Sequence, residues 1–353
     1  MRKGDVMKKK FDFVVPQTQD KNKKIGIGID LGTTNLLVYV QGHGIIFNEP
    51  SVVAFDIETG EVIAGGHDAY QMIGKTHSKI KVCRPLREGV ISDMEAAKAL
   101  LRYVFSRVSN LKNIQNALCL ICCPSEVTQI EREAMKQLAF EMGIADVFIE
   151  EEIKAGAIGS GNDIYSATAI MVVDVGGGTT DVGVLSLGDV VLSQSIRIAG
   201  NYIDNEIIKY VHKNHNLVIG PMTAEKVKKE LITLYADDDR TMRVCGRDLM
   251  KGIPSSTEIN SQEIRMVVLP VMAEVVSVIR NVLEITPPEL SADLVDNGII
   301  IDGGGALIPG LKEFLEEAIQ LPVEISANPL TAVVEGTKVL LKNRGYYLIN
   351  PVD

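Results

Sequence analysis

Hydrophobic and polar positions in the first half of the chain predict strands followed by helices. The apolar run over 25–30 predicts a strand, and a second strand over 36–40 follows at hairpin distance. Apolar residues then recur at helical spacing over 94–108. The uninterrupted apolar run over 116–124 predicts a buried strand, and a further helix is expected over 125–143.

The second half begins the same order again. The pattern predicts strand, glycine-rich turn, strand, turn and strand over 167–195, and then helices over 201–215, 223–235 and 261–286. A strand over 297–305 and further helical segments complete this half. Such an order predicts a duplicated α/β domain, with a sheet in each half and helices on its faces.

Two helix boundaries have distinct sequence features. The helix over 125–143 is expected to have Ser125 as its N-cap and Gly143 near its C-cap. The segment 261–286 contains Pro270, which predicts that the helix starts or bends at this proline.

Length and composition indicate a globular protein with a substantial core. The chain has 353 residues, enough for two domains or one large bilobed one, with 46% hydrophobic and 23% charged residues. A formal net charge of -10 argues against nucleic-acid binding as the main activity, because that activity needs a basic surface.

Cysteines and apolar runs indicate the cellular compartment. Cys119, Cys122 and Cys123 lie in an apolar run without a second ligand pair, so a buried strand is favoured over a zinc site, and free cysteines suit a reducing cytoplasm. No apolar run approaches the roughly 18 residues that span a bilayer. The basic leader, residues 1–23, also contains Phe and Val, so it is either a solvated tail or a segment that docks on an anionic membrane.

A short sequence motif, called the repeated phrase below, occurs twice in the chain. "IGIDLGTTN" covers 27–35 and "VVDVGGGTTD" covers 172–181, and each has an apolar run, Asp-x-Gly and a threonine pair. The duplication makes Asp30 and Asp174 equivalent positions in the two halves. Two facing copies predict a site in the cleft between the halves.

The residue types of the phrase suit phosphate and magnesium. Gly32 allows a tight turn, and Thr33 and Thr34 place hydroxyls beside backbone N–H groups, which together favour an anion. A carboxylate such as Asp30 repels phosphate unless a cation lies between them. Magnesium, which keeps several waters, is therefore expected between Asp30 and Asp174 and is held through water.

Two glycine runs complete the predicted nucleotide site. The consecutive glycines 176–178 leave a long arc of backbone without side chains, which is costly in entropy for a simple turn. A third run, 303–305, follows the strand over 299–301 and can lie against a ligand ring or phosphate. The spacing fits neither a Walker loop nor a dinucleotide fingerprint. Hydrolysis also needs a group that orients water, and the acidic cluster 150–152 and Thr179 are the candidates.

These motifs resemble the superfamily of actin, the 70-kDa heat-shock chaperones and sugar kinases. Within it, the chain is similar to the bacterial MreB family over about 24–343. The similarity extends beyond the loops to the segments "NEPSVVA", "SIRIAG", "GRDL" and "TPPEL".

The resemblance implies an α/β actin-like fold of two duplicated domains, with four subdomains around a nucleotide cleft. The implied subdomains are IA, 24–53, 87–166 and 336–353; IB, 54–86; IIA, 167–202 and 267–335; and IIB, 203–266.

The resemblance also implies the roles of individual residues around bound ATP or ADP and Mg²⁺. Glu152, aligned through the following Ala-Ile-Gly, takes the place of the catalytic glutamate, with Thr179 beside it. The implied nucleotide-binding residues are Asp30, Gly32, Thr33, Thr34, Asn35, Asp174, Gly176, Gly177, Gly178, Thr180, Glu225, Lys228, Lys229, Gly303, Gly304, Gly305 and Ala306.

The chain departs from the family pattern at some of these positions. The family glutamate precedes Pro-x-Ala-Ala-Ala-Ile-Gly, but here Ile153 and Lys154 follow Glu152. We expect that Lys154 pairs with Glu152 or with phosphates and changes the hydrolysis rate. The family segment TGGGA is DGGGA here, which is expected to place Asp302 near the nucleotide floor.

The resemblance implies a cytoskeletal ATPase that forms paired protofilaments on the inner face of the cell membrane and controls cell shape, alone or with related paralogues. A sugar or metabolite kinase is the alternative, and a chaperone ATPase domain is disfavoured because the sequence leaves no room for a peptide-binding domain after it. Three segments are candidates for the membrane contact: the leader, the segment 103–105 and the C-terminal residues 342–353.

Overall fold

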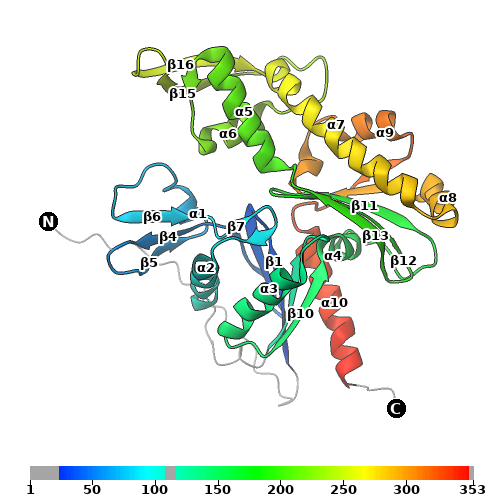
Figure 1. Ribbon diagram of the computed structural model, residues 1–353. Helices are drawn as coiled ribbons and strands as arrows, with labels where there is room; N and C mark the ends of the chain where they lie inside the picture. The colour runs from blue at the N-terminus through cyan, green and yellow to red at the C-terminus, as the bar shows by residue number, and fades with distance from the viewer. Residues whose placement is uncertain (1–23, 108–116, 350–353) are drawn as a thin grey trace.

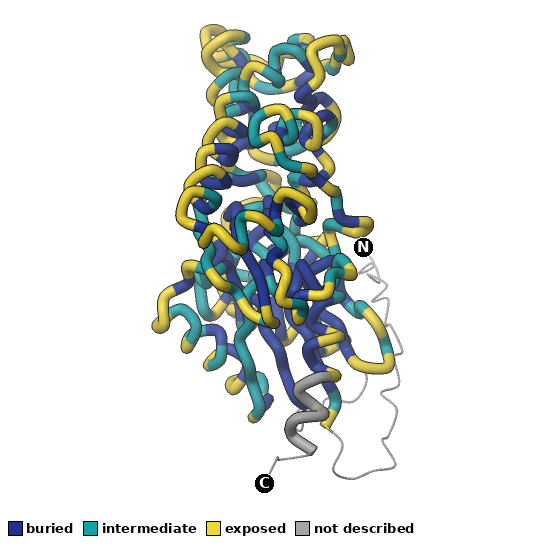
Figure 2. The backbone as a smooth tube through the Cα atoms, turned by 90° about the vertical axis from the view of Figure 1, so that its right-hand side faces the viewer, coloured by how far each residue is buried: buried dark blue, intermediate teal, exposed yellow. Residues whose placement is uncertain are grey.

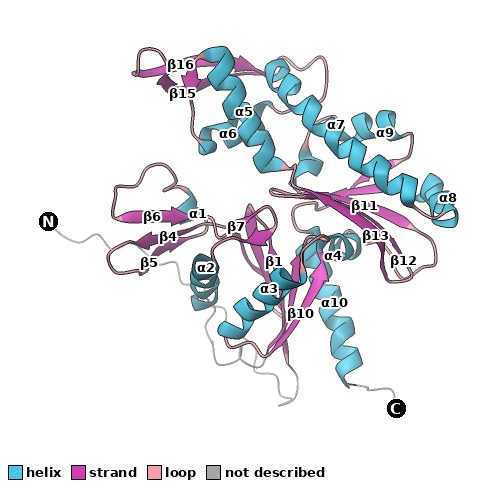
Figure 3. Ribbon diagram, viewed as in Figure 1, coloured by secondary structure: helices cyan, strands magenta, loops and turns pink. Residues whose placement is uncertain are grey.

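The computed structural model describes residues 24–107 and 117–349, with side chains described as far as Lys342. Each half contains a five-stranded sheet flanked by helices (Figures 1 and 3). The first sheet has the order β10-β9-β1-β2-β3, and the second has the order β13-β12-β11-β17-β18. Their strands are β1 (Ile25–Leu31), β2 (Asn35–Val40), β3 (Gly44–Pro50), β9 (Ala117–Cys123), β10 (Asp146–Glu151), β11 (Ile170–Val175), β12 (Thr180–Ser186), β13 (Asp189–Ile196), β17 (Ile299–Asp302) and β18 (Val323–Ile325).

Strand pairing confirms the predicted duplication. In each sheet the first three strands are antiparallel neighbours, and the remaining two add in parallel beside the first. Asp30 pairs with Leu37 across the β1–β2 hairpin, and Asp174 pairs with Asp181 across the β11–β12 hairpin. Both aspartates therefore face the residue seven positions later (37 − 30 and 181 − 174), so they occupy equivalent places.

Smaller elements extend each half. The first half adds α1 (His67–Tyr70), α2 (Met94–Ser106), α3 (Gln129–Glu141), α4 (Glu152–Gly159), α10 (Ala332–Ile349), the sheet β5-β4-β6 (Val62–Gly65, Val53–Asp56, Ile80–Cys83) and the pair β7 (Leu86–Arg87) and β8 (Val90–Ile91). The second adds α5 (Gly200–His215), α6 (Pro221–Leu231), α7 (Ser261–Ile285), α8 (Pro288–Asn297), α9 (Leu311–Ile319), the 3₁₀ turn η2 (Gly304–Leu307) and the sheet β14-β15-β16 (Leu217–Val218, Thr241–Asp248, Pro254–Asn260). The sheet β5-β4-β6 covers nearly the residue range predicted for subdomain IB, and the sheet β14-β15-β16 lies within the range predicted for subdomain IIB. The exact boundaries of the subdomains stay a prediction.

Buried apolar residues form a core in each half and a further cluster where the halves meet. Figure 2 shows the continuous dark-blue strands of these cores. The shared cluster includes Leu120 from the first sheet, Val172 and Ile300 from the second, and Ala155 of α4 and Val334 of α10. α4 and α10 pack closely, since a Cβ on Gly159 would lie 1.8 Å from the Ala332 carbonyl oxygen. The two sheets are thus joined through tightly packed helices at the base of the cleft.

One predicted helix boundary is wrong, and one of the two alternatives for another is excluded. Ser125 does not cap α3; the hydroxyl of Thr128 accepts the N–H of Glu131, whose carboxylate in turn accepts the Thr128 N–H. This capping box satisfies two backbone donors at once, which a cap three residues earlier would not. α7 begins at Ser261 and continues through Pro270, so the helix does not start at the proline, and a bend there stays a prediction.

α7 is long and apolar enough to cross a membrane by length and composition alone. Its buried residues, among them Val268, Met272, Val275 and Ile279, belong to the core of the second half. α7 is therefore a core helix of the second half.

One candidate membrane contact is wrong. Phe105 is only 1% exposed in the core of the first half, and the ring of Tyr103 fills the space beside Gly65, where a Cβ would lie 2.4 Å from it. Side chains packed inside the protein are not available to a lipid surface. The leader and residues 343–353 lie outside the residues whose side chains the structure describes.

Candidate functional site

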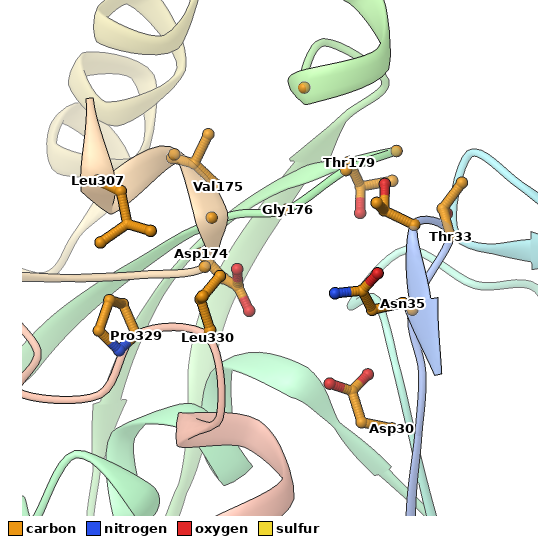
Figure 4. A pocket seen from close by; sticks show the side chains of 18 of the residues that line it. Asp30, Thr33, Asn35, Asp174, Val175, Gly176, Thr179, Leu307, Pro329 and Leu330 are labelled. Carbon is orange, nitrogen blue, oxygen red and sulfur yellow. The ribbon is translucent and has the colours of Figure 1, made fainter. Parts of the chain in front are cut away.

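A cleft of about 590 Å³ lies between the two halves and is lined by both. Three loops form its walls: the first loop (residues 31–35) joins β1 to β2, the second loop (176–179) joins β11 to β12, and the third loop (303–307) follows β17. Figure 4 shows Asp30 and Asn35 on one side of the pocket and Asp174 on the other, and it shows Thr179 beside Thr33. The structure therefore brings the two copies of the repeated phrase together, as predicted.

The glycines of the second loop are required by contact with the first loop. A Cβ on Gly177 would lie 1.8 Å from the Thr34 Oγ1, and one on Gly178 would lie 2.4 Å from the Thr33 Oγ1. These distances are far below van der Waals contact, so a side chain at either glycine would separate the loops. The sequence suggested exposure to a ligand as the reason for the glycine run, and the packing of the two loops is a second reason.

The third loop is packed in the same way against the end of β11, immediately before the second loop. Gly303 has a φ of +79°, and a Cβ there would lie 2.3 Å from the Asp174 Oδ1. At Gly305 a Cβ would meet the Val175 side chain at 2.3 Å. The three loops consequently form one interlocked unit, so the shape of the cleft depends on all of them.

Hydrogen bonds fix the loops to neighbouring elements. The Thr33 Oγ1 accepts the Gly89 N–H at 2.8 Å, which ties the first loop to the β7–β8 turn. On the other side, the Gly177 carbonyl accepts the N–H of Asn201 at 2.8 Å, which ties the second loop to the first turn of α5. A site held from both sides is preorganised for a ligand.

The lower part of the cleft is acidic. Asp30, Glu152 and Asp174 line it, and burial raises the pKa of all three, that of Asp30 to about 7; mutual repulsion raises those of Glu152 and Asp174 further. Asp181, fully buried behind them, is held by the Ser125 N–H at 2.9 Å.

This donor set fits a hydrated divalent cation. Facing carboxylates in a buried site ionise together only when a positive charge lies between them. The described residues contain no group of three or more His, Cys, Asp or Glu side chains arranged as a direct metal cage. Asp30 and Asp174 are therefore suited to hold Mg²⁺ through its water molecules rather than by a full set of protein ligands.

The basic residues of the cleft lie on α6. Lys228 donates to the Gly200 carbonyl and to Asp204 Oδ2, each at 2.9 Å. Glu225 bonds to Lys229 at 2.7 Å. Glu225, Lys228 and Lys229, the three residues of α6 that were predicted to bind nucleotide, all line the cleft. They lie in the second half and share the cleft with the first and second loops.

Of the acidic cluster 150–152, only Glu152 lines the cleft. Glu150 and Glu151 are directed elsewhere, to Lys154 at 3.6 Å and Arg132 at 3.8 Å. The expectation that Lys154 pairs with Glu152 or with phosphates is wrong, because Lys154 bonds to Asp189 at 3.0 Å and does not line the cleft. Two helical positions separate Lys154 from Glu152, which places them on different faces of α4.

Three further predicted residues lie just outside the cleft surface. The Thr180 hydroxyl donates to the Ile198 carbonyl at 2.6 Å. Successive side chains of a strand point to opposite faces, so Thr180 points in the opposite direction to Thr179. Ala306 packs in the core of the second half. Asp302, also expected near the floor, is 0% exposed and pairs with Asp174 across the β11–β17 ladder, so it lies behind the cleft surface.

Sequence reasoning missed an apolar wall and an aromatic residue. Figure 4 shows Leu307, Pro329 and Leu330 close together on the side of the cleft that carries Val175. Tyr70 of α1 also lines the cleft. The segment 329–330 belongs to a loop without glycine or charged motif, so no local pattern singled it out; a flat apolar wall beside polar loops suits the ring of a ligand.

Comparisons with known proteins agree with this architecture. The family model of MreB/Mbl protein matches residues 24–347. The cell shape-determining protein Mbl of Bacillus subtilis is 43% identical over 318 residues, 90% of this chain and 96% of that protein. The cell shape-determining protein MreB of Escherichia coli is 42% identical over 316 residues, 88% of this chain and 91% of that protein.

Solved structures show the same fold. MreB 5 of Spiroplasma citri bound to AMPPNP has a TM-score of 0.90 and 44% identity, and the match covers 94% of this chain and 99% of that one. A double helical filament of MamK has a TM-score of 0.76 at 20% identity, covering 91% and 99%, and supports the actin-like fold alone. Together with the interlocked loops of the cleft, the matched family model and these relatives show that the chain belongs to the MreB/Mbl family.

Proposed function

We propose that this chain is a cytoskeletal ATPase that binds ATP with Mg²⁺ in the cleft, hydrolyses it, and assembles into filaments that control cell shape. The observation that carries the proposal is the pair of equivalent loops with Asp30 and Asp174 facing each other across the cleft (Figure 4). Support also comes from MreB 5 of Spiroplasma citri, whose structures are bound to AMPPNP and to ADP.

In this proposal the loops hold the phosphates. Backbone N–H groups of the second loop and the hydroxyls of Thr33 and Thr34 bind phosphate oxygens. Mg²⁺ supplies positive charge between the phosphates and the water-mediated contacts of Asp30 and Asp174. The adenosine lies between the α6 residues Glu225, Lys228 and Lys229 and the third loop with its apolar wall.

Glu152 and Thr179 are the proposed catalytic residues. Both line the cleft, and in this proposal the terminal phosphate and the attacking water lie beside them. Burial and the neighbouring carboxylates raise the pKa of Glu152. A carboxyl group with a raised pKa and a hydroxyl can together orient one water molecule by hydrogen bonds.

Substitution of Glu152 tests the assignment. We expect Glu152→Ala to retain nucleotide binding and to reduce steady-state phosphate release by about 10²-fold or more, because the group that orients the water is lost. The matched control is Glu151→Ala, one residue earlier, which removes a carboxylate that does not line the cleft and leaves the rate unchanged. Unchanged turnover in Glu152→Ala would remove Glu152 from the mechanism.

Filaments of the proposed kind consist of paired protofilaments in the cytoplasm, at the inner face of the cell membrane and in contact with related paralogues where these are present. The basic leader and the C-terminal segment 342–353 are the remaining candidates for membrane contact. Deletion of residues 1–23 is expected to reduce co-sedimentation with anionic liposomes, because it removes the basic and aromatic side chains of the leader. If binding falls only when 343–353 are removed, the C-terminal segment is the contact instead.

A further inference from the structure

A tyrosine of the first half bonds to a residue of the second half across the cleft. The Tyr70 hydroxyl, at the end of α1, donates to Glu225 Oε2 on α6 at 2.5 Å, and the two residues lie 155 positions apart. Both line the cleft, and Glu225 also bonds to Lys229, whose side chain is 69% exposed. The bond therefore connects the two walls where the cleft meets solvent.

The ring of Tyr70 is held in place by the first half. Glu49 Oε2 accepts the His67 N–H at the start of α1 at 2.9 Å, and Arg107 bonds to the other oxygen of Glu49 at 3.2 Å. The Arg84 guanidinium lies 5.9 Å from the centre of the Tyr70 ring. These contacts place the hydroxyl toward α6 before any ligand arrives.

The protonation states favour a strong bond. Burial raises the pKa of Glu225, but the hydrogen bonds from Lys229 and Tyr70 outweigh it, so the pKa of Glu225 is lowered overall and the carboxylate is ionised near neutral pH. Burial and the adjacent Glu225 raise the pKa of Tyr70, which keeps its proton. A phenol that donates to an ionised carboxylate forms a charge-assisted bond, stronger than one between neutral groups.

Glu225 can accept further hydrogen bonds. Each carboxylate oxygen accepts about two donors, and Lys229 and Tyr70 each occupy one site on different oxygens. Glu225 itself lines the cleft, so its remaining acceptor sites are available to a ligand there. A hydroxyl-bearing ligand, such as the ribose of a nucleotide, can thus bond to Glu225 while the Tyr70 bond stays in place.

We propose that Tyr70 is a positioning residue for the nucleoside end of the site. Its hydroxyl orients Glu225 and holds α1 against α6, so that the cleft stays closed over a bound nucleotide; rupture of this bond is a step in nucleotide release. The proposal rests on the proposed function, since it requires a nucleotide in the cleft.

The test is the dissociation rate of a fluorescent ADP analogue with Mg²⁺, chased with excess ADP in a stopped-flow instrument. Tyr70→Phe keeps the ring and removes the hydroxyl, and we expect release to become about three- to tenfold faster, the factor that corresponds to one lost hydrogen bond. The Michaelis constant for ATP is expected to rise while kcat does not fall, which a general loss of structure would not produce.

Tyr210→Phe is the matched control. The Tyr210 hydroxyl also donates to a glutamate, Glu263, at 3.0 Å, but neither residue lines the cleft, so release should keep the wild-type rate. Release from Tyr70→Phe at the wild-type rate would overturn the inference and leave the proposed function intact. Failure of the wild-type chain to bind the analogue at all would overturn both.

Discussion

At the scale of single residues, two departures from the family pattern that the sequence resemblance implies lie next to each other. Asp302 stands where the family has Thr, and Gly156 stands at the middle alanine of Pro-x-Ala-Ala-Ala-Ile-Gly. A Cβ on Gly156 would lie 2.9 Å from the Asp302 Oδ2. The longer side chain of Asp302 on β17 is therefore accommodated by the missing side chain of Gly156 on α4.

Asp302 is satisfied without reaching the cleft. The Ser160 hydroxyl lies 2.9 and 3.0 Å from its two oxygens, and Ser326 contacts Ser160 at 2.9 Å. Burial raises the pKa of Asp302 to about 6, although the bonds from both serines lower it. Because Ser160 follows α4 and Asp302 ends β17, this network connects the two halves at the base of the cleft.

A double-mutant cycle tests the pairing. In the Asp302→Thr background, Gly156→Ala should raise the free energy of unfolding by about 1 kcal/mol, the helix propensity gained over glycine. In the wild-type background the same change should destabilise the protein, because the new methyl group meets the buried carboxylate. We therefore expect a coupling energy of about 1 kcal/mol or more from denaturant unfolding. An equal effect in both backgrounds would contradict the pairing.

At the scale of elements, the pattern of the sequence predicted β1, β2, β9 and the helices α2, α5, α6 and α7 well, because burial and period are local properties, but it did not predict α1 and α8. It placed the start of α3 wrongly, since both Ser125 and Thr128 are acceptable caps and only Thr128 has a glutamate three positions later. The Ser125 N–H instead donates to Asp181, a contact over 56 positions that no local pattern contains.

Substitution of the two cap candidates distinguishes them. Thr128→Ala should lower the free energy of unfolding by about 1 kcal/mol, because the Glu131 N–H at the start of α3 loses its hydroxyl acceptor. Ser125→Ala should have a smaller effect, since the Ser125 hydroxyl has no hydrogen-bond partner in the described structure. Equal losses in thermal or denaturant unfolding would refute Thr128 as the cap.

The candidate site was predictable to different degrees. The glycine-rich loops and their aspartates were found because glycine, threonine and aspartate at this spacing have few other uses, and the repeat placed them together. The directions of the Thr180 and Lys154 side chains were not predicted. The direction of Thr180 depends on the alternation of side chains along the strand, and that of Lys154 depends on its partner Asp189 in β13. The Tyr70–Glu225 contact joins segments 155 positions apart and has no sequence motif.

At the scale of the whole molecule, a cleft lies between two halves that each contain one copy of the same sheet. The helices α4 and α10 pack between the two sheets (Figure 1). A ligand that contacts the first and second loops together holds the two halves in one relative orientation. In the proposed function, that orientation is the state in which one copy of the chain binds the next. Nucleotide state would then control assembly through the relative position of the halves.

Sedimentation of the full chain with Mg²⁺-ATP, with electron microscopy of the pellet, tests this account most directly. We expect the protein to pellet as paired filaments with ATP and to stay largely in the supernatant without nucleotide. The double substitution Asp30→Ala and Asp174→Ala, which removes both proposed water-mediated magnesium contacts, should abolish the ATP-dependent fraction. A chain that stays soluble with ATP, or that pellets equally without nucleotide and in the double variant, would contradict the proposal that nucleotide binding in this cleft drives filament assembly.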